Sequence, residues 1–123
     1  MGIFDLGLKS RFIRNADIIV KPYEAPTPKG HLSVLSYNIG FAVGPVQKTV
    51  GETRAKSEYL HNLNEIVRVV EETDADILLL QEVDLNSRRS HYLDQLQYLQ
   101  DRLEWPYAAC TTTWKTYVPF EKV

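Results

Sequence analysis

Two short stretches of the sequence lead into polar side chains of the kind that bind metal ions and phosphate. The alternating stretch 31–40 contains Asn38 near its end, and the apolar run 77–80 leads directly into Gln81 and Glu82. A carboxylate beside a neutral amide oxygen suits a hard, oxygen-preferring cation such as Mg²⁺, which commonly takes one or two carboxylates together with waters and phosphate oxygens. Asn38 and Glu82 are therefore the candidate metal-binding and catalytic residues.

The elements around these residues predict a strand–helix–strand unit. Residues 31–40 alternate and are rich in β-forming residues, which favours a strand. The run 77–80 is apolar throughout, so we expect a strand buried on both faces of a parallel sheet. Between them, apolar residues recur at helical spacing: Leu60, Leu63, Ile66, Val67 and Val70. One connecting helix makes the strands parallel, and their carboxyl ends then meet at the edge where open α/β sheets bind ligands.

The flanking segments complete an expected α/β order of strand, helix, strand, helix and strand. The second helix should end before Pro106, and 107–117 is β-branched and aromatic, which predicts a third strand. The apolar stripe of that helix is Leu93, Leu96, Leu99 and Leu103. We interpret 1–30 as an N-terminal arm with a proline-rich linker and place the domain at 31–123. Within the arm, 18–20 is either a short strand or an apolar clip onto the domain.

Each of the two candidate residues also has an ordinary structural interpretation. An asparagine shortly before a glycine is typical of a turn, and Asn38 precedes Gly40 by two positions. Glu82 can simply mark the point where a strand leaves the core for solvent. The occurrence of both residues at the ends of two neighbouring strands is what favours a metal site.

The pair of motifs resembles the opening of a known enzyme superfamily. LSVLSYNIG, then a helix, then ADILLLQEVD is similar to the endonuclease/exonuclease/phosphatase superfamily, the DNase I-like metal-dependent phosphoesterases. Its members begin with a strand ending in Asn and continue through a helix to a strand ending in Gln-Glu-Val or a close variant. The later SRRS and DQ and the WPYAA segment are similar to the corresponding later segments of some bacterial members. The resemblance covers residues 31–118.

This resemblance implies the N-terminal half of a DNase I-like α/β sandwich that uses Mg²⁺ or Mn²⁺. Glu82 would be the carboxylate ligand of the metal, and Asn38 the amide near the metal and the phosphate. Gln81 and Asp84 would support these two residues from behind. In the family the metal polarises a phosphoryl oxygen and steadies the leaving group while an activated water attacks in line.

Substrate contacts are less defined by the sequence. Arg88 and Arg89 follow the second strand, and their guanidinium groups could bind a substrate phosphate. A solvated basic turn before a helix is the simpler interpretation. The family cleaves DNA, RNA, phospholipid and inositol phosphate esters, so the resemblance leaves the class of phosphate-ester substrate open.

The resemblance is also incomplete. Family members are about twice this length, and their second half supplies an Asp-x-Asn element and a terminal Asp-His pair. None of the three histidines follows an Asp at an expected strand end, so we expect His31, His61 and His91 in surface or capping roles. The expectation is half of a catalytic domain, whether a truncated piece, a split gene product or a degenerate paralogue.

Composition argues against several other classes of protein. A net charge of −2 provides no field for non-specific coating of nucleic acid. The single Cys110 excludes an internal disulfide framework and a cysteine-based zinc cluster. The stretch 40–44 matches neither a dinucleotide fingerprint nor a P-loop. No signal peptide and no apolar stretch of membrane-spanning length is present, so a soluble cytoplasmic protein is expected.

Two functions are consistent with these observations. The first is a metal-dependent phosphoesterase to which this chain contributes Asn38 and Glu82, with activity expected only in a longer polypeptide or with a complementing C-terminal half. The second is a non-enzymatic assembly or interaction module. Half of a two-sheet sandwich leaves an apolar sheet face open, and such a face drives self-association or pairing with another chain.

Overall fold

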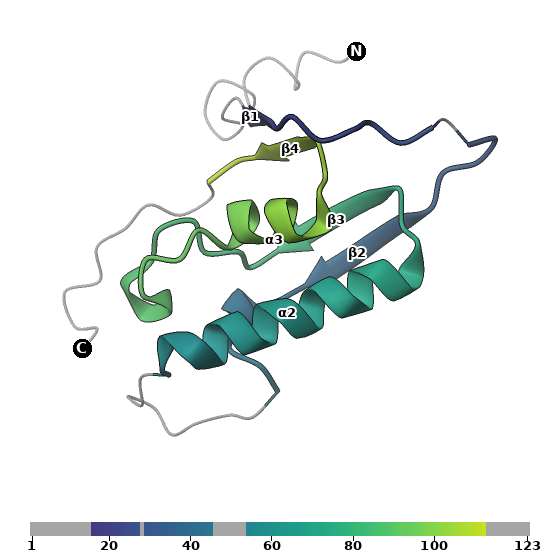
Figure 1. Ribbon diagram of the computed structural model, residues 1–123. Helices are drawn as coiled ribbons and strands as arrows, with labels where there is room; N and C mark the ends of the chain where they lie inside the picture. The colour runs from purple at the N-terminus through teal and green to yellow at the C-terminus, as the bar shows by residue number, and fades with distance from the viewer. Residues whose placement is uncertain (1–15, 28, 46–53, 113–123) are drawn as a thin grey trace, which may run out of the picture.

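The computed structural model describes residues 16–27, 29–45 and 54–112. The elements within these ranges (Figure 1) are β1 (Asp17–Val20), β2 (Val34–Asn38), the 3₁₀ turn η1 (Gly40–Ala42), α2 (Lys56–Thr73), β3 (Ile77–Gln81), the 3₁₀ turn η2 (Arg88–Ser90), α3 (Gln95–Leu103) and β4 (Tyr107–Cys110). The mixed α/β class expected from the sequence is confirmed. Within the described part of the chain, neither helix has the length and apolar composition needed to cross a bilayer.

β2 and β3 form the predicted parallel pair, connected through α2. The register begins with Val34 opposite Ile77. It ends with Asn38 opposite Gln81, so the two strands finish at the same level. This pairing brings the two polar segments singled out in the sequence to one edge of the sheet.

Helix α2 forms the core with the inner face of this sheet. Its buried side chains are Tyr59, Leu63, Ile66, Val67 and Val70. Four of these belong to the predicted apolar stripe; the fifth expected member, Leu60, is half-buried. The helix begins after Ala55, whose backbone N–H donates to the Glu58 carboxylate at 2.7 Å, and it ends at Asp74, which adopts a left-handed conformation.

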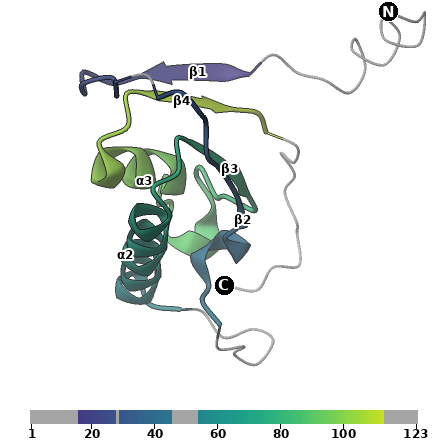
Figure 2. The same cartoon turned by 90° about the vertical axis from the view of Figure 1, so that its right-hand side faces the viewer.

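The prediction that 77–80 is buried on both faces is wrong. Leu78 and Leu80 pack against the core, whereas Ile77 and Leu79 are 40% and 50% exposed. The neighbouring Val34 on β2 is 57% exposed. Figure 2 shows the reason: α2 and α3 both lie on the same side of β2 and β3. No helix in the described residues covers the other side, which we call the open face (Val34, Ser36, Ile77 and Leu79).

Helix α3 is shorter than its leucine stripe suggested. It starts at Gln95, after Asp94 accepts a hydrogen bond from the Gln97 N–H at 2.9 Å, so Leu93 precedes the helix. Leu99 is buried, whereas Leu93, Leu96 and Leu103 are half-buried.

Part of the N-terminal arm belongs to the fold. β1 pairs antiparallel with β4, which confirms a strand at 18–20. Lys21 forms an ion pair with Asp101 of α3 at 2.8 Å, and the Tyr23 hydroxyl donates to the same carboxylate at 2.9 Å. The predicted third strand, 107–117, is shorter than expected because β4 ends at Cys110; positions 113–117, and residues 1–15 of the arm, lie outside the described residues.

The amino ends of β2 and β3 are joined by a hydrogen-bonded carboxylate. Asp76 accepts from the Ser33 backbone N–H at 2.8 Å and from the Ser33 hydroxyl at 2.9 Å, and Lys29 lies 3.2 Å from its other oxygen. These contacts favour the ionised carboxylate. The backbone and side-chain hydrogen bonds from Ser33, followed by the one from Lys29, lower the pKa of Asp76 from 3.8 to about 2.

The depressed pKa of Asp76 predicts a specific acid dependence of stability. A carboxylate with a lower pKa in the folded state stabilises the fold above its unfolded pKa near 3.8 and loses that contribution as the pH falls towards 2. At pH 7 we expect Asp76→Asn to have a lower urea midpoint than the unmodified chain. Near pH 2 the two proteins should have nearly the same midpoint, because the unmodified chain has by then lost the contribution of the ionised carboxylate. The control is Asp74→Asn, because the side chain of Asp74 is 92% exposed. Parallel pH profiles for the Asp76→Asn protein and the unmodified chain would contradict the assignment.

Candidate functional site

Asn38 and Glu82 lie at neighbouring strand ends, one register position apart. Asn38 is the last residue of β2 and stands opposite Gln81, and Glu82 follows Gln81 directly. The pairing continues past the strands, because the N–H of Ile39 donates to the Gln81 carbonyl at 3.1 Å and that of Phe41 to the Glu82 carbonyl at 2.7 Å. The side chains of Asn38, Gln81 and Glu82 are exposed. A ligand at this edge would therefore reach the carboxylate and the amide from solvent.

The Asn38 side chain forms the turn that its sequence context allowed. Its Oδ1 accepts a hydrogen bond from the backbone N–H of Gly40 at 2.9 Å. An amide oxygen has two lone pairs, so this bond fixes the orientation of the side chain without using all of its acceptor capacity. The turn and the ligand interpretations of Asn38 are therefore compatible.

Three non-glycine residues at this edge, Phe41, Ala42 and Glu82, have the left-handed backbone that four others in the described ranges also adopt. Gly40, Phe41 and Ala42 have φ values of 52°, 56° and 57°, and Glu82 has a φ of 55°. A bulky residue such as Phe41 rarely adopts this left-handed conformation, and each such residue costs on the order of 1–3 kcal/mol unless its surroundings fix it. The strained residues lie in two segments that hydrogen-bond to each other. Strain of this kind clusters at functional sites.

Gln81 and Asp84, expected to support the metal ligands, have other partners. The Gln81 amide donates to the Leu79 carbonyl at 3.0 Å and lies 3.4 Å from the Ser36 hydroxyl, on the open face. Asp84 is only 5% exposed and accepts two hydrogen bonds from the Arg89 guanidinium, at 2.8 and 2.9 Å. Asp84 thus anchors the segment that follows Glu82.

The two arginines singled out in the sequence occupy different environments. The guanidinium carbon of Arg89 lies 3.5 Å from the centre of the Phe41 ring, in addition to its paired contact with Asp84. Arg88 is exposed at the start of η2. Arg89 therefore connects the segments after β2 and β3, and Arg88 is the arginine of the pair that faces solvent.

Gln95, the second residue of the DQ segment, is a site-associated residue to which the sequence analysis assigned no role. It is fully buried at the first position of α3; its Oε1 accepts from the Asp84 N–H at 2.9 Å, and its Nε2 donates to the Phe41 carbonyl at 2.7 Å. Its backbone N–H also donates to the Asp84 carbonyl at 2.9 Å. Gln95 stands four positions before the buried Leu99, so helical spacing could have indicated a buried amide. Its hydrogen-bond partners could not have been read from spacing.

The donor set at the edge fits a magnesium-type ion. It consists of the Glu82 carboxylate and the Asn38 amide; no cluster of three or more His, Cys, Asp or Glu side chains occurs in the described ranges. Zinc requires three or four protein ligands, and Ca²⁺ takes six to eight oxygens. Mg²⁺ often keeps several waters and binds through one or two protein oxygens plus phosphate.

All three histidines are exposed. The Nε2 of His91 is 2.7 Å from the Arg54 carbonyl oxygen, and its ring packs edge-on against Tyr59 at a centroid distance of 6.0 Å. His61 lies on α2, and His31 precedes β2.

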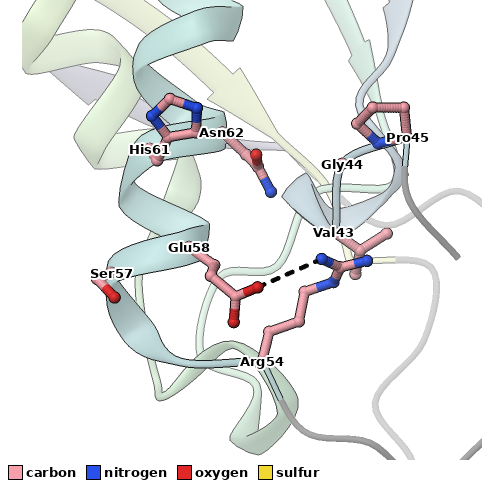
Figure 3. Close-up of a pocket in the computed structure, with 8 residues that line it drawn as sticks. All are labelled: Val43, Gly44, Pro45, Arg54, Ser57, Glu58, His61 and Asn62. Carbon is pink, nitrogen blue, oxygen red and sulfur yellow. Dashed lines mark ion pairs between the residues drawn. The ribbon is translucent and has the colours of Figure 1, made fainter. Parts of the chain in front are cut away.

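A pocket of about 490 Å³ lies between the segment 43–45 and the first turns of α2 (Figure 3). Arg54 and Glu58 form an ion pair of 3.7 Å beside it, and Asn62 donates from Nδ2 to the Ala42 carbonyl at 2.9 Å. A Cβ on Gly44 (φ 77°) would stand 2.8 Å from that Asn62 nitrogen, so this loop requires glycine to pack on the helix. Neither Asn38 nor Glu82 lines the pocket.

A scan against protein-family models, a search of curated proteins and a search of solved structures each return no match.

Proposed function

We propose that this chain supplies the metal- and phosphate-binding part of a Mg²⁺-dependent phosphoesterase of the endonuclease/exonuclease/phosphatase type. The observation that carries the proposal is the in-register termination of β2 and β3, which brings Asn38, and Glu82 one position beyond its partner Gln81, to the same edge of the sheet. The left-handed backbone at Phe41 and Glu82 supports it, because such strain persists where a site needs a fixed geometry.

The two side chains have distinct roles in this proposal. Glu82 provides the negative charge that binds the cation. Asn38 contributes its amide oxygen to the cation or its amide N–H to a phosphate oxygen, oriented by the bond from Gly40. When bound, the metal polarises the phosphoryl oxygen and stabilises the leaving group. Activation of the attacking water is assigned to groups in a longer polypeptide or in a complementing half.

Substitution of Glu82 by glutamine tests the ligand assignment. Glu82→Gln removes the charge and keeps the shape, so we expect Mn²⁺ to bind at least about tenfold more weakly and its stabilisation of the fold to be lost. Mn²⁺ titration by electron paramagnetic resonance gives the dissociation constants.

A matched control exists in Glu104, which is also exposed and has a φ of 54° after the end of an element. Glu104→Gln should bind Mn²⁺ as the unmodified chain does. Equal binding by the Glu82→Gln and unmodified chains would contradict the assignment of Glu82. Any hydrolysis of a simple phosphodiester by the chain with Mn²⁺ should also disappear in Glu82→Gln, and turnover that survives would place the chemistry elsewhere.

A second candidate function, an assembly or interaction module, is favoured by the open face. Val34, Ile77 and Leu79 project from it at 40–57% exposure. Contiguous apolar surface of this kind is typical of an association site. Sedimentation over a range of chain concentrations tests this candidate: a mass above that of the monomer supports self-association, and a monomer at all concentrations opposes it.

A further inference from the structure

We propose that Gln95 is the positioning residue of the candidate metal site. Its side-chain amide, held at the start of α3, fixes the loop that follows Asn38 relative to the loop that follows Glu82. The inference rests on the proposed function, because these two loops carry the proposed ligands.

One amide bridges the two loops directly. Nε2 donates to the carbonyl of Phe41, three residues after Asn38, at 2.7 Å. Oε1 accepts from the N–H of Asp84, two residues after Glu82, at 2.9 Å. The Gln95 backbone N–H adds a bond of 2.9 Å to the Asp84 carbonyl. A single, fully buried side chain therefore links the two ligand-bearing loops, in addition to the backbone bond from Phe41 to Glu82 and the contacts of Arg89 with Asp84 and Phe41.

The chemistry of the contact requires an amide. One partner is a carbonyl acceptor and the other an N–H donor, so the bridging group must donate at one atom and accept at the other. A methionine of similar length has no donor, and its thioether sulfur is only a weak acceptor. A glutamate can accept from Asp84, but its carboxylate would face the Phe41 carbonyl without a proton to donate.

Gln100 shows that burial of a glutamine in α3 does not by itself imply such a role. It lies five residues further along α3 and is 4% exposed, yet its side-chain oxygen and nitrogen have no hydrogen-bond partner among the described residues. Gln95 and Gln100 are thus two buried glutamines of one helix that differ in their contacts. Gln100→Met is the matched control for Gln95→Met.

The experiment measures Mn²⁺ affinity and amide exchange on the same variants. We expect Gln95→Met to weaken Mn²⁺ binding by at least about tenfold, the cost typical of losing a group that orients a metal ligand. The Phe41 and Ile39 amides, which bond to the Glu82 and Gln81 carbonyls, should also exchange faster with solvent. Gln100→Met should leave both measurements unchanged.

A milder variant keeps the test usable if Gln95→Met does not fold. Gln95→Glu retains the acceptor towards Asp84 and loses the donor to Phe41, so faster exchange at Phe41 together with weaker Mn²⁺ binding supports the proposal. Unchanged Mn²⁺ affinity in a folded Gln95 variant overturns this inference alone. An unmodified chain that binds no Mn²⁺ overturns the proposed function, and the inference with it.

Discussion

Replacement of Leu63 by alanine lowers the free energy of unfolding by about 3–5 kcal/mol, the upper part of the range for buried leucines. Leu63 lies on α2 at the centre of the core and is fully buried. Removing its side chain loses buried apolar surface and leaves a cavity that neighbouring side chains fill only in part. Because small domains are stable by roughly 5–15 kcal/mol, this loss is a large share of the total.

Urea unfolding followed by circular dichroism measures the effect, with Val69→Ala as the comparison. Val69 is on the same helix but is 36% exposed, so its truncation should cost less than about 1 kcal/mol. Equal losses at the two positions would contradict the placement of Leu63 in the core. A change in slope without a change in midpoint would indicate altered compactness rather than altered stability.

The sequence predicted α2 and the β2–β3 pair well because one physical rule governs each. The helical spacing of Leu63, Ile66 and Val70 is required for any helix that buries one face, and these residues are buried. A connection through a single helix makes the two strands parallel, which is sufficient to bring the end of β2 beside the end of β3. The proximity of the candidate metal ligands followed from topology alone.

The sequence failed where burial depends on what covers a surface. The run 77–80 is apolar on both faces of its strand, and the usual explanation is a sheet covered on both sides. In the described residues both helices lie on one side, so Ile77 and Leu79 remain exposed. An apolar run indicates that its residues favour burial. It does not identify the segment or chain that covers them.

The inner structure of the candidate site was also beyond the sequence. No propensity rule places Phe41 in a left-handed conformation, because that conformation is imposed by contacts from elsewhere. Those contacts come from Gln95 and Arg89, which lie some fifty positions later in the sequence. A pattern within one strand or one helix carries no information about such pairs.

The exposed pair Ile77 and Leu79 leads to the second prediction, on association. If the open face mediates self-association, the double substitution Ile77→Thr and Leu79→Thr should weaken it roughly 100-fold, about 2.7 kcal/mol, because central apolar side chains carry most of the binding energy of an interface. Threonine is β-branched and favours a strand, so the parallel pair should persist. Sedimentation equilibrium of the two proteins over the same concentrations gives the dissociation constants.

The chain provides a matched control for this experiment in β1. Ile18 and Val20 have the same two-residue spacing on a strand of the other sheet and are 76% and 66% exposed. Threonine at both positions removes a similar apolar surface at a different place, so association through the open face should be unaffected. Equal weakening by the two double substitutions would mean that association is non-specific. A chain that is monomeric before any substitution would instead point to a different partner for the face, and the complementing half of a phosphoesterase domain then becomes the occupant to test.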